Sequence, residues 1–146
     1  MFQWPVRVYW EDTDAGGIVF YANYLKFFER SRTEWLRSLG IEQQRLKDST
    51  GGMFVVTETS IRYHRSARLD DELIVTASMV ETGRASMIIK QQALSKTEQN
   101  DRSSRNLGDG QFSAGPPQGK LTPSGAAHTA QRKAWGQHCS AKARYG

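Results

Sequence analysis

The feature that most constrains the fold of this chain is an amphipathic segment at 23–39 with large side chains along one side only. One face carries residues at the 3.6-residue spacing of an α-helix, namely Tyr24, Phe28, Ser31, Trp35 and Leu39. Asn23 can cap free N–H groups at its start, and Gly40 follows as a stop signal. A helix that is apolar on one side has to lie across another layer, such as a sheet.

Four segments have the alternation or the β-branched composition of strands. They are Trp4–Trp10, Met53–Tyr63, Glu72–Glu81 and Arg84–Leu94. The last two are joined by a tight turn at Gly83 and should form an antiparallel hairpin, whereas residues 41–52 are expected to form a loop. One strand, one helix and then consecutive strands predict an α+β fold, with a curved antiparallel sheet wrapped around one long helix.

From Ser95 onward the periodicity is lost, and glycine, proline and polar residues dominate. We therefore expect a folded domain at 1–94 and a low-complexity, disordered tail at 95–146. Residues 1–95 carry 12 basic and 12 acidic residues, so the net charge of +5 comes entirely from the remainder. The basic residues there are dispersed and have few aromatic neighbours, so no nucleic-acid partner is expected.

Cysteine usage and the ends of the chain indicate a cytoplasmic protein. The single cysteine, Cys139, lies in a polar segment, which excludes an intramolecular disulfide and a cysteine-based metal cluster. The chain opens Met-Phe-Gln-Trp-Pro, without the basic and apolar regions of a secretory signal, and no apolar run reaches membrane-spanning length. We expect no metal site and no organic cofactor.

The stretch from Glu11 to Tyr24 is the best candidate for chemistry. It brings an acidic cluster, the pair Gly16 and Gly17, and an apolar segment to the start of the predicted helix. Such a layout can set a carboxylate beside unpaired backbone N–H donors. Carboxylates and glycines are also common in ordinary turns, and on spacing alone a solvated turn leading into a helix is the simpler interpretation.

A family resemblance favours the catalytic interpretation. The segments Glu-Asp-Thr-Asp-Ala-Gly-Gly-Ile-Val-Phe-Tyr-Ala-Asn-Tyr and Arg-Ser-Ala-Arg-Leu-Asp-Asp closely resemble the hotdog-fold acyl-CoA thioesterases associated with the Tol-Pal system, in the 4-hydroxybenzoyl-CoA thioesterase group. The resemblance covers residues 1 to about 94. It implies that Asp14 is the catalytic carboxylate, that the backbone N–H near Tyr21 polarises the thioester carbonyl, and that Gly17 and Val19 contact the substrate. Many relatives have histidine at the position of Tyr21, so only the backbone role carries over.

The activity that the resemblance implies is hydrolysis of short- to medium-chain or aromatic acyl-CoA to free acid and CoA. Asp14 would act as general base or as nucleophile, and the sequence leaves both open. The leaving thiol, with a pKa of about 8.5, needs little help from a general acid. Arg65 and Arg68 are candidate ligands for the CoA phosphates; the alternative is that they are solvated or paired with Asp70 and Asp71. Family members are homodimers or homotetramers with active sites at the subunit interface.

The chain departs from the family after Leu94, where relatives have a fifth strand rich in valine. In the family that strand lies between the second and fourth strands, and here it is missing or replaced. One hypothesis is that residues from about 95 onward come from a shifted reading frame, which would leave an inactive product. Another is that this is a non-catalytic hotdog module that binds acyl-CoA or acyl-carrier protein.

Overall fold

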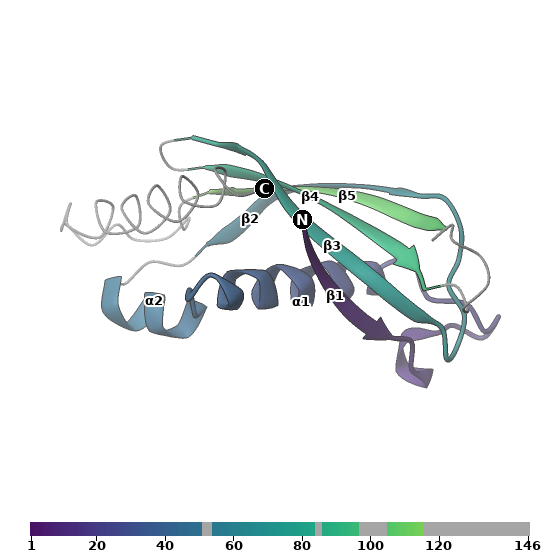
Figure 1. Ribbon diagram of the computed structural model, residues 1–146. Coiled ribbons are helices and arrows are strands. Elements are labelled where there is room, and N and C mark those ends of the chain that lie inside the picture. Colours follow the sequence, from purple (N-terminus) through teal and green to yellow (C-terminus); the bar gives the residue numbers. More distant parts are fainter. Residues whose placement is uncertain (51–53, 84–85, 97–104, 116–146) are drawn as a thin grey trace.

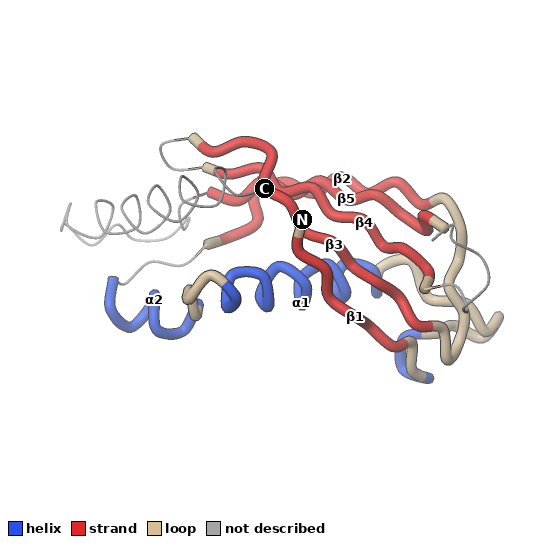
Figure 2. The backbone as a smooth tube through the Cα atoms, in the orientation of Figure 1, coloured by secondary structure: helices blue, strands red, loops and turns tan. Residues whose placement is uncertain are grey.

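In the computed structural model one long helix lies across one face of a five-stranded sheet, which confirms the predicted α+β architecture (Figure 1, Figure 2). The structure describes residues 1–50, 54–83, 86–96 and 105–115. The strands are β1 (Phe2–Arg7), β2 (Val55–Tyr63), β3 (Glu72–Thr82), β4 (Met87–Ser95) and β5 (Asn106–Gly115). The helices are α1 (Asn23–Ser38) and α2 (Gln43–Thr50), and a 3-10 turn, η1, spans Trp10–Asp12.

All neighbouring strands in the sheet are antiparallel, in the order β1-β3-β4-β5-β2. The predicted hairpin of β3 and β4 is confirmed. The edge strands are β1 and β2, and β2 runs for 9 residues with most of its side chains exposed. One side of β2 therefore offers unpaired backbone groups within the described part of the chain.

The main core lies between α1 and the inner face of the sheet. Phe27 and Phe28 of α1 are fully buried and belong to the same apolar cluster as Leu73 and Val75 of β3. Burial of each such side chain stabilises the fold by about 1.5–3 kcal/mol. Ser31, the one small polar residue in the helical stripe, is also buried there, and its hydroxyl donates to the Val75 carbonyl at 3.1 Å.

The final strand, expected to be missing or replaced, is present with a different sequence. Residues 106–115 form β5, which pairs with β4 on one side and β2 on the other, so the strand is replaced by an unusual sequence. The predicted disorder from 95 onward therefore does not apply to residues 105–115, while 97–104 and 116–146 lie outside the described residues. Backbone pairing on both sides and burial of Leu107, Phe112 and Ala114 hold the strand despite its glycines.

Gly110 shows why one of those glycines fits in β5. A Cβ at this position would lie 2.6 Å from Cε2 of Phe112 and 3.3 Å from Cε2 of Phe28. The Phe28 and Phe112 rings already contact each other, with centroids 5.4 Å apart. The space that a side chain would need is therefore filled by two core rings.

Three local predictions differ from the structure. Residues 43–50, expected to be loop, form α2. Asn23, expected to cap α1, is its first residue, and the N-cap is Ala22; the Asn23 side-chain amide donates to the Asp12 carbonyl at 2.9 Å. The first strand ends at Arg7, because the chain turns into η1 and leaves Trp10 78% exposed.

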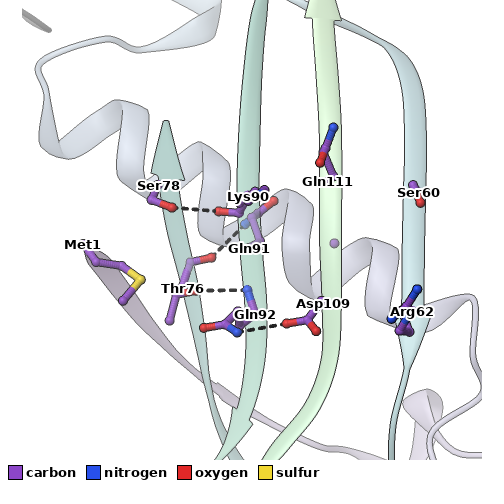
Figure 3. A pocket seen from close by; sticks show the side chains of 11 residues that line it. Met1, Ser60, Arg62, Thr76, Ser78, Lys90, Gln91, Gln92, Asp109 and Gln111 are labelled. Atoms are coloured by element: carbon purple, nitrogen blue, oxygen red, sulfur yellow. Dashed lines mark hydrogen bonds between the residues drawn. The ribbon is translucent and has the colours of Figure 1, made fainter. Parts of the chain in front are cut away.

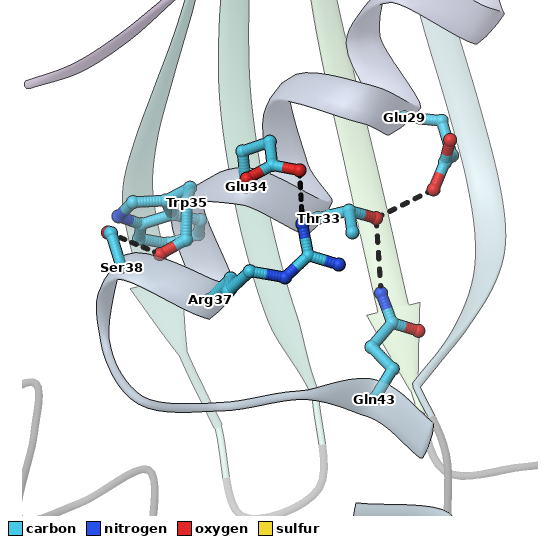
Figure 4. Close-up of polar contacts among 7 residues, drawn as sticks. All are labelled: Glu29, Thr33, Glu34, Trp35, Arg37, Ser38 and Gln43. Atoms are coloured by element: carbon cyan, nitrogen blue, oxygen red, sulfur yellow. Dashed lines mark hydrogen bonds and ion pairs between the residues drawn. The ribbon is translucent and has the colours of Figure 1, made fainter. Parts of the chain in front are cut away.

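Side-chain contacts join the end of α1 to α2 (Figure 4). The Gln43 amide donates to the Thr33 hydroxyl at 3.5 Å, and that hydroxyl donates to Glu29 at 2.7 Å. Arg37 pairs with Glu34 one turn earlier on the helix. These contacts lie in the second half of α1. The acidic loop is at the other end of the helix, where the candidate site lies.

Candidate active site

Asp12 anchors the loop that leads into α1. Its side chain is 1% exposed, and its Oδ2 accepts a hydrogen bond from the Tyr9 N–H at 2.9 Å. Its carbonyl accepts from the Phe20 N–H at 3.0 Å and from the Asn23 side chain at 2.9 Å. A buried carboxylate with all its contacts inside the loop has a structural role, so Asp12 is not free for catalysis.

Asp14 has the opposite environment, because its side chain is exposed at the tip of the same loop. Its backbone closes the loop: the Asp14 N–H donates to the Ile18 carbonyl at 2.9 Å, and the Gly17 N–H donates to the Asp14 carbonyl at 3.0 Å. The Gly16 N–H donates to Asp14 Oδ1 at 2.8 Å, which orients the carboxylate. Within the described residues, Oδ2 accepts no hydrogen bond and can bind a ligand or water.

Gly17 allows this turn to close so tightly. Its φ is +73°, in the left-handed region where glycine has no steric penalty. Val19, two residues on, is 4% exposed, packs in the core and donates its N–H to the Ala67 carbonyl at 2.9 Å. Of the two predicted substrate contacts, Gly17 is therefore on the surface, while the Val19 side chain is not accessible.

The start of α1 supplies a backbone donor. Among the described residues, the Tyr21 N–H donates to no acceptor, and the Tyr21 side chain is 62% exposed. The residue precedes the N-cap of a 16-residue helix, where the macrodipole is positive and favours an oxyanion. An unpaired N–H at this position is what the role predicted for the Tyr21 backbone requires, and the role itself stays a prediction.

Three tyrosine rings pack around that helix start. The Tyr63 ring lies 6.1 Å from the Tyr21 ring and 5.6 Å from the Tyr24 ring, both edge-on. Burial raises the pKa of Tyr24, whose hydroxyl accepts from the Ala67 N–H at 3.0 Å. Desolvation raises the pKa of Tyr63 as well. The sequence predicted Tyr63 only as the end of a strand and not as a site residue, because its contact with Tyr21 spans 42 residues and no local pattern signals it.

Arg65 and Arg68, the predicted phosphate ligands, are both exposed but differ in position. Arg68 forms an isolated β-bridge with Ile18, which places it beside the acidic loop. The Arg65 N–H donates to the Leu107 carbonyl at 3.2 Å, beside β5. Neither guanidinium forms an ion pair with another described residue, and only the backbone of Arg68 contacts Asp71, at 2.8 Å.

A partly buried arginine on α1 was also not anticipated from the sequence. Arg32 lies on α1, donates to Gln91 Oε1 at 2.8 Å and stacks over the Phe112 ring at 4.1 Å from its centroid. Burial lowers the pKa of Arg32 to about 10, so the side chain stays charged at neutral pH. Gln91 is held in turn by the carbonyls of Phe28 and Thr76. This network joins α1 to β4 in the core and lies about two helical turns from Tyr24.

A pocket of about 440 Å³ lies elsewhere, on the face of the sheet away from α1 (Figure 3). Most of the residues that line it are polar, including Ser60, Arg62, Lys90, Asp109 and Gln111. No residue of the Glu11–Tyr24 loop lines it. It also lacks a backbone donor group set beside an exposed carboxylate, so it is not the candidate active site.

Two negative findings concern the described ranges alone. No group of three or more His, Cys, Asp or Glu side chains there could hold a metal ion. No helix of those ranges has the length and apolarity needed to cross a membrane.

Comparison with known proteins identifies the family. The thioesterase superfamily matches residues 16–100, more than half of the chain. The acyl-CoA thioesterase YbgC of Haemophilus influenzae is 47% identical over 96 residues, which are 66% of this chain and 71% of that protein. The superfamily match begins two residues after Asp14 and includes Gly17, Tyr21 and all of α1.

Solved structures share the fold. A probable thioesterase from Bartonella henselae is 28% identical and covers 79% of this chain and 90% of its own, with a TM-score of 0.69. The 4-hydroxybenzoyl CoA thioesterase of a Pseudomonas species is 17% identical, with a TM-score of 0.71 over 78% of this chain and 82% of its own, a likeness of fold alone. The predicted hotdog fold is thus confirmed, and the chain belongs to the thioesterase superfamily.

Proposed function

We propose that this protein hydrolyses acyl-CoA thioesters to the free acid and CoA, with short- to medium-chain or aromatic acyl groups as substrates. The observation that carries the proposal is an exposed Asp14 carboxylate on the same loop as the unpaired Tyr21 N–H, at the start of α1. Family membership and the acyl-CoA thioesterase among its relatives support the same reaction.

The chemistry follows from these groups. As an oxygen nucleophile adds to the thioester carbonyl, its oxygen becomes an oxyanion, which the Tyr21 N–H and the helix dipole stabilise. Asp14 either removes a proton from the attacking water or adds to the carbonyl itself to form an anhydride that water then opens. The C–S bond breaks in either case, and the CoA thiolate leaves without an acid because its pKa is about 8.5.

Binding of the CoA moiety is assigned to the surface beside the loop. Arg68 is the stronger candidate for a phosphate contact, because its bridge to Ile18 keeps it next to Asp14 while its guanidinium is unpaired among the described groups. Arg65 is a second candidate, further toward β5. Gly17 leaves room for the substrate to approach the loop backbone.

The proposed enzyme is a homodimer or homotetramer. The exposed edge of β2 supports this, since a second copy can pair with its free backbone groups. Tyr63 ends β2, so such pairing would bring the second subunit close to the helix start. Use of acyl-CoA supports a cytoplasmic location, and an association with the Tol-Pal system rests on the sequence resemblance alone.

The test is release of CoA thiol from a panel of short-chain, medium-chain and aromatic acyl-CoA thioesters. Asp14→Asn keeps the shape of the side chain and removes its charge, so turnover should fall by about a thousandfold. Asp48→Asn on α2 is the matched control, because among the described residues that carboxylate contacts only Gln44, at 2.9 Å; its turnover should equal that of the wild type.

Other outcomes distinguish the alternatives. Saturable binding of acyl-CoA or acyl-carrier protein without thiol release would show a non-catalytic module and reject the hydrolase. Equal turnover in Asp14→Asn and Asp48→Asn would reject Asp14 as the reactive group.

A further inference from the structure

Tyr63 contacts the backbone of the proposed oxyanion donor directly. Its hydroxyl donates to the Tyr21 carbonyl at 2.9 Å, across 42 residues of sequence. Its ring also packs edge-on against Tyr21 and Tyr24, at 6.1 and 5.6 Å between centroids. The last residue of β2 therefore holds both the backbone and the side chain of Tyr21.

The position of Tyr63 is itself fixed by the sheet. Tyr63 pairs with Gly108 of β5, and the next N–H, that of His64, donates to the Leu107 carbonyl at 2.9 Å. Four residues after Tyr63, the Ala67 carbonyl accepts from the Val19 N–H at 2.9 Å, and the Ala67 N–H donates to the Tyr24 hydroxyl at 3.0 Å. Residues 63–67 thus support the turn before α1 at three points.

Tyr21 needs such support because it lies outside regular structure. It precedes Ala22, the N-cap of α1, so the helix ladder does not determine where its N–H points. An oxyanion donor works only if it is directed in advance at the place where charge develops. A misplacement of about 1 Å costs as much as a hundredfold in rate.

We infer that Tyr63 is a positioning residue for the proposed hydrolysis. Its hydroxyl holds the Tyr21 carbonyl, which lies in the peptide unit after the Tyr21 N–H, and through the shared Cα it restrains the direction in which that N–H points at the thioester oxygen. The inference rests on the proposed function. Desolvation raises the pKa of Tyr63, so the phenol remains a hydrogen-bond donor throughout the neutral pH range.

The test compares Tyr63→Phe with Tyr9→Phe in the full chain. The first change removes the clamp and keeps the ring contacts; the second removes a hydroxyl from a ring that is 61% exposed. Tyr63→Phe should lower kcat by roughly tenfold to a hundredfold with KM changed less than about twofold. Tyr9→Phe should change neither constant. A kcat of Tyr63→Phe equal to that of Tyr9→Phe would overturn the inference.

Hydrogen–deuterium exchange supplies a readout that does not need turnover. In Tyr63→Phe, peptides covering 18–24 should exchange faster, while peptides from the second half of α1 keep the wild-type rate. Unchanged exchange at 18–24 overturns the clamp whether or not the protein is active. A wild type without thiol release would reject the proposed function separately, because the exchange experiment still decides the role of Tyr63.

Discussion

The two faces of the five-stranded sheet differ in how their polar groups are arranged. The outer face has the pocket, and its polar side chains bond to one another, as Gln92 does to Asp109 at 2.9 Å. The inner face is covered by α1 and is mostly apolar, with Gln91 as a buried polar exception. Near the start of α1, Asp14 Oδ2 and the Tyr21 N–H have no partner among the described residues. The candidate site is therefore distinguished by its unpaired acceptor and donor groups, and not by the presence of a pocket.

The largest effect should come from Tyr21→Pro, which deletes the backbone N–H that the proposed mechanism uses. We expect kcat to fall by about 10²–10³-fold, equivalent to about 2.7–4 kcal/mol of transition-state stabilisation. Tyr21→Ala keeps the N–H and should retain activity within a few fold. Thermal melts of both variants check that the fold survives. Equal loss in the two variants would mean that the side chain, rather than the backbone, carries the function.

The next largest effect concerns the inner face of β5. Gly110→Ala places a Cβ 2.6 Å from the Phe112 ring, so the free energy of unfolding should decrease by about 1–3 kcal/mol. Gln111→Ala alters the neighbouring residue, which is exposed on the outer face, and should change the free energy of unfolding by less than about 0.5 kcal/mol. Denaturant titration measures both. Similar values for the two variants would show that β5 is not packed against α1 as described.

A smaller effect should appear on the outer face at low pH. Hydrogen bonds from Gln92, His64 and Asn106 lower the pKa of Asp109 to about 2. Because the folded-state pKa lies below the unfolded value, this stabilisation is complete above about pH 4 and is lost as the pH falls toward 2. The carboxylate is 44% exposed, so solvent screening should limit the effect to less than about 1 kcal/mol. Asp109→Asn should flatten the stability profile between pH 4 and 2, and an unchanged profile would contradict the assignment.

The smallest effect should be that of Lys90→Ala in the pocket. Its side chain is exposed and lines the outer hollow, so kcat and KM for any acyl-CoA in the panel should stay within about twofold of the wild type. A specific rise in KM would show that substrate reaches the outer face, which would break the distinction between the two faces. Arg68→Ala is the informative partner, because the same loss of charge beside the acidic loop should raise KM.

Much of this architecture could be predicted because its signals are local. The stripe on α1 follows from helical periodicity, and the hairpin of β3 and β4 follows from alternation around Gly83. The acidic loop was predicted from motif and spacing, and the structure does place Asp14 at its exposed tip. Such features depend on residues within a few turns or strand positions of one another.

The features that sequence reasoning missed depend on partners distant in the chain. β5 looks unstructured in isolation, since it combines glycines with only scattered apolar residues, but pairing with β4 and β2 satisfies its backbone. Val19 was predicted to contact the substrate, but its side chain is buried in the core. Asn23 is a residue type that often caps helices, but its side-chain amide donates to the Asp12 carbonyl instead.

By itself, then, the sequence determined the helix, the hairpin and the loop that presents a carboxylate, because periodicity and turn chemistry act over short ranges. Only the tertiary structure decided that residues 106–115 complete the sheet and that Tyr63 meets the Tyr21 carbonyl across 42 residues. The physical reason is that backbone pairing and side-chain contacts between distant segments form only once the chain has closed around its core.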